Sequence, residues 1–431
     1  MKTILAILLG AAALGAQAEP MFRGGAAHSG LYDADGPREF HRVRWAFPTG
    51  NRVMSSPVMQ ADTLYFGSDD GNVYAVEASS GRQVWKRATK GPVSGTPAVA
   101  GDTLYVGSYD GHFYALNAAT GAMRWKFTTG GERHFEAKGL HGMTPMGQTF
   151  FDPFDMYLSS PVVVGDTVFF GSGDGHMYAL DRANGAVRWK FKTGDVVHAS
   201  PAYSDGVLYF GSWDSYFYAI DAQTGREKWK FHGGEDPLIH NQVGFQSSAA
   251  VVDGVVYVGC RDSNLYALDA ATGKELWRVN NAGSWVITSP AVVDGRVIFA
   301  TSDSALFQIV DAKTGKEIAK QQAKAYMFGS PAVARGIVYQ PMTNGTLEAR
   351  DAANGNLLWT YRTEASKENA GWALTADGRF NTPMLFPSNG GEVNINGVGK
   401  QFAVGSMFSS PMVARNTVYV GSTDGNVYAI E

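Results

Sequence analysis

The sequence predicts an all-β fold: a single ring of eight four-stranded antiparallel blades, the architecture called a β-propeller. Three observations predict it: a motif that recurs along most of the chain, a tryptophan near the end of most repeats, and a last repeat that stops one strand short. The motif reads GSYDGHFYALNAATGAMRW at 107–125 and GSGDGHMYALDRANGAVRW at 171–189. Units of this size cannot bury an apolar face alone, so they stack on their neighbours.

The repeat at 200–231 illustrates how the residues predict a blade. Its four runs are SPAYS, VLYFGS, YFYAID and REKWKF, and turns rich in Asp, Gly and Ser separate them. Short β-rich runs divided by such turns form antiparallel hairpins, and we expect VLYFGS to alternate between a buried and an exposed face. Four strands linked in this way make one propeller blade.

A tryptophan marks the fourth strand of most repeats. Most of these positions lie about 40 residues apart, which is a blade spacing rather than that of a helical solenoid. A large flat indole at a blade edge indicates packing between blades, so we assign these residues no ligand. Ala319 holds the same position in one repeat, and the tryptophans are Trp85, Trp125, Trp189, Trp229, Trp277 and Trp359.

The two ends of the chain predict how the ring closes. The last repeat, GSTDGNVYAIE, reaches Glu431 after its third strand, whereas VRWAFPTG at 43–50 reads as a fourth strand with no partners before it. We expect Trp45 to complete the last blade. This arrangement closes a propeller over 42–431 and removes two exposed sheet edges.

Residues 1–18 read as a signal peptide. Lys2 precedes an apolar run at 4–14, and Ala16-Gln17-Ala18 is a small-residue cleavage site. We expect cleavage after Ala18 and an N-terminal segment at 19–41. No cysteine adjoins this site and no other run is long and apolar enough to span a bilayer, so neither a lipid anchor nor a membrane span is expected. The expected product is a periplasmic or secreted monomer.

Composition narrows the chemistry further. Cys260 is the only cysteine, which excludes an intramolecular disulfide, a CxxCH haem site and a cysteine zinc site. We interpret Cys260 as a small buried residue. The formal net charge is −4 and no basic tract is present, so nucleic acid is not an expected partner. P-loop, HExxH and GxSxG motifs are missing from the sequence.

Acidic and histidine residues recur in the repeat turns. The GSxDG aspartates resemble calcium ligands, but their regular recurrence indicates turn residues that accept backbone N–H groups. We interpret His112 and His176 as solvated turn residues. His134, His141 and Asp155 share one insertion and could form a metal or acid–base cluster, although their spacing fits no standard ligand pattern.

Two insertions interrupt the repeat, at 130–157 and 363–407. Both fall between the outer strand of one blade and the inner strand of the next, so they should cover the face that carries the GSxDG turns. Long loops in compact domains are usually functional segments or lids. The alternative is that these two only shield the central channel.

Unusual side chains gather on that same face. The GSxDG turn becomes GSWDS, GCRDS and ATSDS in the fourth to sixth repeats. Aromatic, amide and cationic side chains in one concave region are typical of a pocket for a small molecule or peptide, and the alternative is a wet funnel plugged by them. The candidate ligand-binding residues are Arg133, His141, His198, Trp213, Gln242, Phe245, Gln246, Arg261, Trp285, Tyr326, Phe328 and Phe408.

The repeated YVGSxDGxxYALDAxTGxxxWxF units resemble the pyrroloquinoline-quinone (PQQ)-like β-propeller repeat family. MFRGGAAHSG at 21–30 is similar to the N-terminal segment of many exported members. The resemblance covers nearly the whole chain after residue 18. It implies the fold but not one function, because the family holds two unlike groups.

One group is the quinoprotein alcohol dehydrogenases, which bind PQQ and calcium. Many of them stack PQQ on a vicinal disulfide, which a single Cys260 cannot form, and no motif places their calcium ligands or catalytic aspartate in this chain. Under this alternative, Arg261, Arg133 and Lys138 are the candidate partners of the PQQ carboxylates. His198 or Asp155 would act as the base.

The other group is scaffold-like and includes BamB of the outer-membrane β-barrel assembly machine, which binds partner proteins without a cofactor. Resemblance to this group implies a non-catalytic propeller without a cofactor that engages a protein segment or small ligand at the funnel. Peptide binding would use Trp285, Phe245, Phe328 and Phe408, with strand addition at a blade edge as a further mode. We expect this role and keep the PQQ-dependent dehydrogenase as the alternative.

Overall fold

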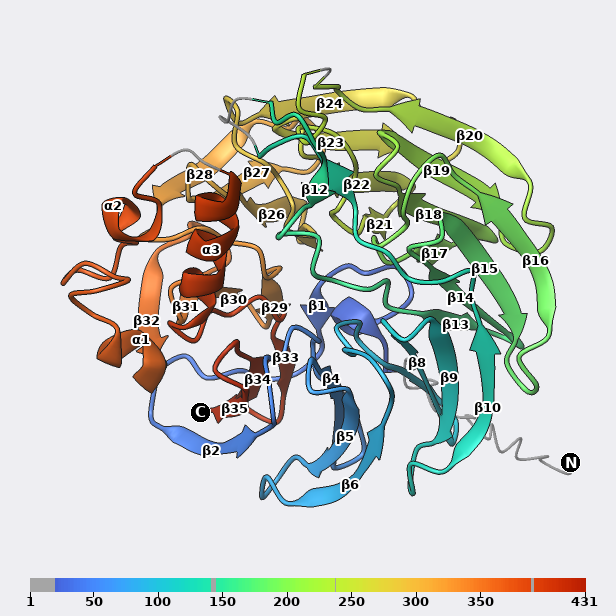
Figure 1. Ribbon diagram of the computed structural model, residues 1–431, viewed down its shortest axis with the longest axis horizontal. Coiled ribbons are helices and arrows are strands. Elements are labelled where there is room, and N and C mark those ends of the chain that lie inside the picture. Colours follow the sequence, from blue (N-terminus) through green and yellow to red (C-terminus); the bar gives the residue numbers. More distant parts are fainter. Residues whose placement is uncertain (1–19, 141–144, 237, 389–390) are drawn as a thin grey trace, which may run out of the picture.

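The computed structural model describes residues 20–140, 145–236, 238–388 and 391–431. The signal peptide expected at 1–18 and the candidate residue His141 therefore lie outside the described residues. The described chain forms a closed ring of eight blades around a central axis (Figure 1). The all-β propeller predicted from the repeat is confirmed.

The blades follow one another in chain order, and within blades 1 to 7 the strands run from the axis outward. Blades 1 to 4 contain β3 (Val58–Gln60), β4 (Thr63–Ser68), β5 (Asn72–Glu77), β6 (Gln83–Ala88); β7 (Ala98–Ala100), β8 (Thr103–Ser108), β9 (His112–Asn117), β10 (Met123–Thr128); β13 (Val162–Val164), β14 (Thr167–Gly171), β15 (His176–Asp181), β16 (Val187–Lys192); and β17 (Ala202–Ser204), β18 (Val207–Gly211), β19 (Tyr216–Asp221), β20 (Glu227–His232). Blades 5 to 8 contain β21 (Ala250–Val252), β22 (Val255–Gly259), β23 (Asn264–Asp269), β24 (Glu275–Asn280); β25 (Ala291–Val293), β26 (Arg296–Ala300), β27 (Leu306–Asp311), β28 (Glu317–Gln322); β29 (Ala332–Ala334), β30 (Ile337–Pro341), β31 (Thr346–Asp351), β32 (Leu357–Arg362); and β33 (Met412–Ala414), β34 (Thr417–Gly421), β35 (Asn426–Ile430), β2 (Val43–Pro48).

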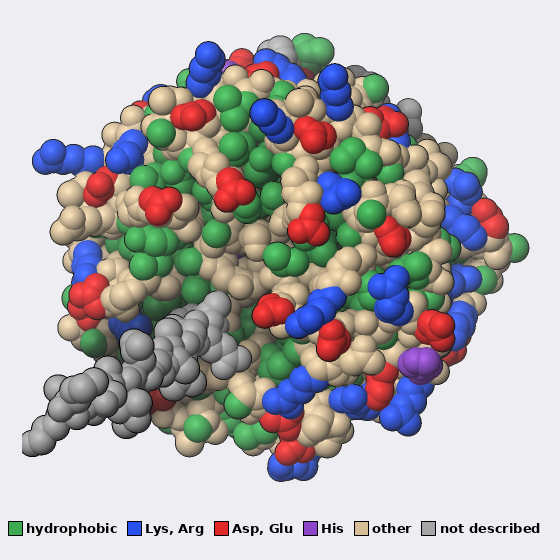
Figure 2. Space-filling view, turned by 180° about the vertical axis from the view of Figure 1, so that it is seen from behind, with side chains coloured by type: hydrophobic (Ala, Val, Ile, Leu, Met, Phe, Trp, Pro, Cys, Tyr) green, Lys and Arg blue, Asp and Glu red, His purple; other side chains and the backbone are tan. Residues whose placement is uncertain are grey.

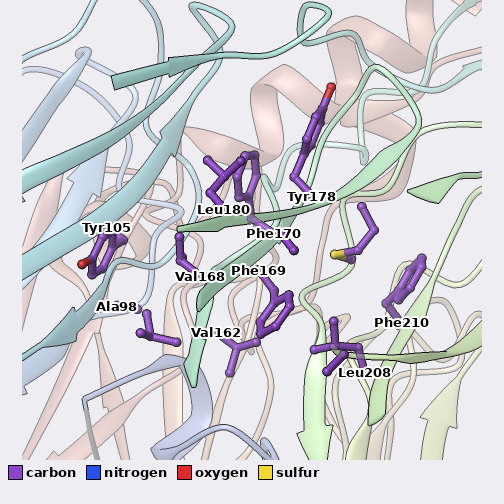
Figure 3. Close-up of a cluster of buried hydrophobic side chains, with 14 of the residues drawn as sticks. Ala98, Tyr105, Val162, Val168, Phe169, Phe170, Tyr178, Leu180, Leu208 and Phe210 are labelled. Carbon is purple, nitrogen blue, oxygen red and sulfur yellow. The ribbon is translucent and has the colours of Figure 1, made fainter. Parts of the chain in front are cut away.

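The middle strands of each blade are buried on both faces. In blade 4 every residue of β18 is buried, whereas the outer strand β20 alternates between exposed and covered positions. The alternation expected for VLYFG is therefore wrong, because the neighbouring blades cover both faces of a central strand. Figure 3 shows one such interface, where Phe169, Phe170 and Leu180 of blade 3 pack between side chains of blades 2 and 4.

The ring closes at blade 8, where the two ends of the chain meet. Strand β2 pairs antiparallel with β35 and sets Trp45 opposite Ala429. The Arg44 guanidinium also lies 2.7 Å from the Glu431 carboxylate. Closure by the N-terminal strand at Trp45 is confirmed, and the last sheet is left with a paired outer strand.

Each indole in the repeat holds the next blade by a hydrogen bond and by ring contact. Trp45 Nε1 donates to the Ala78 carbonyl at 3.0 Å, and a Cβ on Gly81 would lie 2.8 Å from the Trp45 ring. Gly81 has φ +74°, so this turn needs glycine both for its backbone and for the indole. Trp359 instead donates to the Pro37 carbonyl at 2.9 Å, because blade 8 takes its outer strand from the other end of the chain.

A guanidinium takes the place of the missing indole in blade 6. Arg350 of β31 lies over the Phe307 ring at 5.1 Å, hydrogen bonds to Gln321, and donates to the Gly355 carbonyl at 2.9 Å. Glu348 accepts from Arg350 Nε at 2.8 Å, so this buried charge is paired. Arg350 of blade 7 thus occupies the space that an indole at position 319 would fill.

Eight hydroxyl groups form a closed ring where the inner strands begin. The Ser56 N–H donates to Thr96 Oγ1 at 3.1 Å, and the same bond passes from blade to blade until the Ser410 N–H donates to Ser56 Oγ at 2.8 Å. The ring consists of Ser56, Thr96, Ser160, Ser200, Ser248, Ser289, Ser330 and Ser410. These bonds satisfy backbone donors that would otherwise be buried without a partner.

The N-terminal segment lies across the inner strands. Carbonyls of Pro20, Ala26, Ala27, Ser29 and Gly30 accept the N–H groups of residues 99, 203, 251, 292 and 333. The segment contains a 3-10 turn, η1 (Phe22–Gly24), and β1 (Leu31–Tyr32), which adds to β29 as a parallel fifth strand. Buried Arg23 donates to the carbonyls of Pro290 and Pro331 at 2.8 and 3.0 Å. The channel is therefore crossed by the chain's own first described residues.

The two insertions carry the remaining elements. The first contains β11 (Glu136–Ala137) and β12 (Phe150–Phe151), and the second contains α1 (Glu364–Glu368), α2 (Thr382–Leu385) and α3 (Gly391–Phe402). Both lie over the ring on the near side of Figure 1. On the opposite face, Figure 2 shows acidic and basic side chains mixed. Among the helices of the described chain, none is long and apolar enough to cross a membrane.

Candidate functional site

Insertion 1, the connection between β10 and β13, is pinned to the ring by a buried arginine. Arg261 is fully buried in the turn between β22 and β23, and its Nη1 lies 2.5 Å from Asp152 Oδ2 in the insertion. Gln246 Oε1 accepts from Arg261 Nε and Nη2 at 3.0 and 2.8 Å, while Gln246 Nε2 donates to the Phe154 carbonyl at 2.7 Å. Each polar side chain in this cluster thus has a partner within the protein.

Two indoles complete the surroundings of this guanidinium. Its Cζ lies 4.2 Å from the Trp213 ring centroid and 4.0 Å from that of Trp285. Trp213 in turn stacks on Phe135 of insertion 1, with centroids 4.3 Å apart. Aromatic faces attract cations most strongly when water is excluded, so the cluster stabilises a charge that burial alone would disfavour.

A second buried charge pair holds the same insertion. His198 Nδ1 lies 2.7 Å from Asp155 Oδ1, and His198 Nε2 lies 3.7 Å from Glu132 Oε2. Burial opposes a charged imidazole, but the two carboxylates prevail and raise the pKa of His198 to about 10. Burial likewise opposes a charged Asp155, yet His198 and the Phe135 N–H lower the pKa of this carboxyl. At neutral pH the pair is ionic.

Of the other two residues in the expected acid–base cluster, the structure describes only His134. His134 Nδ1 lies 2.6 Å from the Asp155 backbone carbonyl, and the His134 ring stacks on Tyr109 at 4.8 Å. Within the described residues, no group of three or more His, Cys, Asp or Glu side chains is placed to hold a metal ion. His134 therefore contributes packing to insertion 1.

Insertion 2, the connection between β32 and β33, supplies a short helical cap. Thr363 caps α1 by accepting the Ser366 N–H at 3.1 Å, and Ser366 Oγ bonds to the Asn344 carbonyl of the blade 7 turn. A Cβ on Gly397 of α3 would lie 2.3 Å from the Phe386 ring. The absence of a side chain at Gly397 lets α3 pack directly on the residue that follows α2.

A pocket of about 240 Å³ lies between the two insertions and blades 5 to 7. We call it the inter-insertion pocket. Insertion 1 contributes Leu140 and Phe154, and α3 contributes Asn394, Val398 and Gln401 along one helix face. Its aromatic walls are Phe154, Trp285, Tyr326, Phe328 and Phe386. Both insertions are thus needed to form it.

Polar side chains also line the inter-insertion pocket, namely Ser302, Asp303, Thr382, Asn394 and Gln401. Asp303, in the turn between β26 and β27, is exposed at its edge with Ser302 beside it. Burial and the negative charge of Asp303 raise the pKa of Tyr326 to about 12, so this phenol stays neutral. Gln401 is only 2% exposed, and its Nε2 has no hydrogen-bond partner. The pocket combines aromatic surface with one carboxylate and one unsatisfied amide.

A separate, smaller cavity of about 40 Å³ lies on the axis. The hydroxyl ring surrounds it, Phe22 of the N-terminal segment lines it, and Met54, Phe328 and Phe408 also contribute. Met54, Trp285, Phe328 and Phe408 belong to one apolar cluster together with Leu140. The centre of the funnel is therefore filled by side chains, and the open space lies off the axis.

The described residues that we predicted to bind a ligand lie in four places, and Phe328 and Gln246 each belong to two of them. Trp285, Tyr326 and Phe328 line the inter-insertion pocket, and Phe328 lines the axial cavity together with His198, Gln246 and Phe408. Trp213, Gln246 and Arg261 belong to the cluster under insertion 1. The others lie apart: Phe245 is buried between blades, Arg133 pairs with Asp195 at 2.6 Å on the surface, and Gln242 borders an outer groove.

Several pocket residues were not predicted from the sequence. Asp303 lies in the unusual ATSDS turn. The sequence singled out this turn but did not indicate that Asp303 would be a binding residue. Phe386, Asn394, Val398 and Gln401 lie in an insertion rich in Gly and Asn, and no motif sets them apart. Cys260 is buried as expected, and burial raises the pKa of its thiol.

A family model described as outer membrane protein assembly factor BamB matches residues 30–155, 152–283 and 261–431. The chain belongs to this family. The BamB-family matches follow one another around the ring, as expected for a fold built from repeats. They include β1 and the closing strand β2 as well as both insertions.

Solved structures share the fold at low sequence identity. BamB from Moraxella catarrhalis is 17% identical, with a TM-score of 0.64 over 90% of this chain and 97% of that chain. Quinohemoprotein alcohol dehydrogenase from Comamonas testosteroni is 14% identical, with a TM-score of 0.68 over 95% of this chain and 80% of that chain. A europium-containing methanol dehydrogenase is 14% identical, with a TM-score of 0.69 over 96% and 98%. The comparison with curated proteins finds no match.

Proposed function

We propose that this chain is an exported, non-catalytic binding propeller that engages a protein segment or a small ligand in the inter-insertion pocket. The observation that carries the proposal is the pocket of about 240 Å³ between two insertions and the ring, with five aromatic walls and a single charged residue among its described lining. Concave aromatic sites of this kind hold small ligands or single side chains of a partner. Membership of the BamB family supports a protein partner.

Export rests on the first residues of the sequence. A charged residue, an apolar run and a small-residue site at 1–18 are typical of a secretory signal. We place the mature protein in the periplasm or outside the cell. There the pocket would meet secreted or envelope proteins and small envelope molecules.

The PQQ-dependent alternative receives less support from the residues. PQQ is a tricarboxylate and needs cationic partners, but Arg261 is engaged by Asp152 and Gln246, and Arg133 is engaged by Asp195. The third candidate, Lys138, is exposed and lines neither the inter-insertion pocket nor the axial cavity. The charged group at the inter-insertion pocket is the carboxylate of Asp303, which would repel such a ligand. The described residues therefore do not fit PQQ, and we derive no step through it.

Site-specific photo-crosslinking in exporting cells tests the proposed protein partner. A photoreactive residue at Met384, half exposed on α2 beside the pocket, should capture a partner segment. The matched control is Val187, equally exposed on the outer strand β16. Adducts at 384 and none at 187 would support the proposal. Equal labelling at both positions would contradict a specific partner at this pocket.

Two further measurements separate a small ligand from a cofactor. Native mass spectrometry should detect a retained small ligand on the wild type and its loss in Tyr326→Ala, with Tyr216→Ala on β19 as the control. Isothermal titration of the mature protein with PQQ, with and without calcium, should show no binding. Tight calcium-dependent binding of PQQ would overturn the non-catalytic role.

A further inference from the structure

The inter-insertion pocket carries information about the charge of its ligand. Two features bear on this point: an acidic side chain that lacks the tyrosine partner found in most blades, and aromatic walls. The inference drawn from them rests on the proposed function, because it names the chemistry of the ligand at the same pocket.

In most blades the aspartate of the turn between the second and third strands is engaged by hydrogen bonds within its own blade or with the adjoining connection. In six blades the turn aspartate accepts the hydroxyl of a tyrosine four residues later, as Asp70 does from Tyr74 at 2.6 Å; the other pairs are Asp110–Tyr114, Asp174–Tyr178, Asp214–Tyr218, Asp262–Tyr266 and Asp424–Tyr428. The same aspartates accept backbone N–H groups, for example Asp70 from Gly50 at 2.8 Å. These carboxylates are structural and have little capacity left for a ligand.

Blade 6 breaks this arrangement next to the pocket. Its turn is one residue longer, because Ala300 pairs with Phe307 where Gly67 pairs with Val73 in blade 1. Gln308 stands at the tyrosine position and donates to Asn281 instead of to an aspartate. Within the described residues, Asp303 has no ion pair, and its one hydrogen bond comes from Ser302 Oγ at 2.9 Å. Its carboxylate is therefore free to bind.

The walls of the pocket favour a positive charge. The faces of aromatic rings carry negative electrostatic potential, which attracts ammonium groups near Trp, Tyr and Phe rings. Phe154 and Phe328 stack with centroids 5.1 Å apart, and Tyr326 adds a neutral phenol next to Asp303. Among the described residues that line the pocket there is no Lys, Arg or His, so Asp303 sets the sign of its charge.

Gln401 adds a polar side chain to the lining of the pocket. Its side chain is almost completely buried against the pocket, and its Nε2 lacks a partner. This nitrogen has almost no accessible surface, so a ligand in the pocket does not reach it without a rearrangement of the side chain.

We infer that the inter-insertion pocket binds an alkylammonium group, with the charged nitrogen at Asp303 and the alkyl chain among the aromatic walls. The group belongs either to a free amine or to a lysine side chain of a partner protein. A volume of about 240 Å³ admits a four-carbon chain with its ammonium head. Arg261, which contacts one of these walls through Trp285, does not oppose this charge, because Asp152 neutralises it.

Titration with isosteric probes tests the inference. The probes are n-butylammonium, butan-1-ol and butyrate, with binding followed by calorimetry and by saturation-transfer NMR on the ligand methyl groups. We expect n-butylammonium to bind at least tenfold more tightly than butan-1-ol, and butyrate to bind weakest. Raising the salt concentration should weaken only the ammonium probe. Equal binding of the three probes, or binding of none, would overturn the inference.

The variant Asp303→Asn assigns the charge to one residue. It should lower the affinity for n-butylammonium at least tenfold and leave butan-1-ol unchanged. Asp377→Asn is the matched control, because Asp377 is an exposed acid of insertion 2 outside the pocket lining. Identical unfolding curves would establish that both variants fold. An unchanged ammonium affinity in Asp303→Asn would refute the inference.

The source of the ammonium group is decided by comparing two ligands. N-acetyl-lysine-methylamide carries the same head on a backbone, and n-butylammonium carries it free. If the lysine derivative binds at least as tightly, the source is a lysine of a protein partner, and if it binds much more weakly, the source is a free amine. Crosslinks at 384 without any ammonium binding would refute this inference alone and leave the proposed binding role intact.

Discussion

Two regions on the face covered by the insertions contain similar residue types but differ in how these residues are bonded. One is the buried cluster under insertion 1, and the other is the inter-insertion pocket. Under insertion 1, the polar groups of Arg261, Asp152, His198 and Asp155 bind one another and are almost entirely buried. At the inter-insertion pocket, Asp303 lacks an ion pair and Gln401 lacks a hydrogen bond in the described structure. Polar residues gathered in a funnel therefore do not by themselves indicate a ligand site. The difference lies in the charged groups, which pair with one another under insertion 1, whereas Asp303 has no ion pair in the described structure.

The largest effect on stability should follow from removing a charge in the buried cluster under insertion 1. Asp152→Ala leaves the Arg261 guanidinium buried without its carboxylate, so the free energy of unfolding should fall by about 3–5 kcal/mol. Limited proteolysis should then cleave insertion 1 in the folded protein. Arg133→Met, which removes an exposed partner of Asp195, is the control and should change stability by less than about 1 kcal/mol. A similar small loss in Asp152→Ala would show that this cluster does not hold the insertion.

A substitution in the ring gives a stability effect with which both regions can be compared. Trp45→Ala removes the indole that packs on Gly81 and donates to Ala78, so we expect a loss of about 3 kcal/mol in chemical unfolding. Val84→Ala, at an exposed position of β6, should be close to neutral. An unchanged unfolding curve for Trp45→Ala would mean that closure at blade 8 contributes little.

The His198–Asp155 pair predicts a pH dependence of stability. The folded pKa of His198, about 10, exceeds its unfolded value near 6.5, so its contribution is complete below the lower value and is lost as pH rises toward 10. The slope cannot exceed about 1.4 kcal/mol per pH unit for one proton. The pKa of Asp155 is lowered, so its contribution is present above about pH 4 and is lost in acid.

Unfolding measured from pH 4 to 10 for the wild type and His198→Gln tests this pair. The stability difference between the two proteins should shrink as the solution becomes alkaline. His232→Gln is the control, because His232 pairs with Glu235 on the surface. A constant difference across the whole range would show that His198 is neutral in the folded protein.

The smallest effect is expected on the pocket side. Asp303→Ala removes an exposed carboxylate with one hydrogen bond, so stability should change by no more than about 0.5 kcal/mol in either direction. Thermal unfolding at low and high salt would measure this directly. A large loss would show that Asp303 has a structural role and would remove the contrast between the two regions.

The sequence predicted the ring because its determinants are local. Hairpin turns, strand lengths and the indole spacing all lie within one repeat, and Trp45 could be assigned to the last blade by counting strands. The burial of the middle strands was not predicted correctly. They are buried on both faces, because the neighbouring blades cover each side of the sheet. Three predicted residues, Trp285, Tyr326 and Phe328, do line the pocket, because they directly precede inner strands.

The remaining pocket residues depend on contacts that sequence does not record. Helix α3 reads GEVNINGVGKQF, and its glycines and asparagines favour a loop over a helix. It forms because Gly397 packs against Phe386, a contact that no local pattern predicts. Likewise, Arg261 and Asp303 are both charged residues in unusual turns. Arg261 is structural because Asp152, which is distant in sequence, pairs with it. Asp303 can bind a ligand because it has no ion pair in the described structure.

The pairing of β2 with β35 has a consequence for how the chain acquires its structure. Arg44 and Glu431 are in contact although their positions differ by 387, so blade 8 cannot form until both β2 and β35 have been synthesised. Contacts this remote in sequence slow folding, and until they form, the strands at both ends expose unpaired edges that can aggregate. Removal of either β2 or β35 would therefore prevent closure of the ring at blade 8.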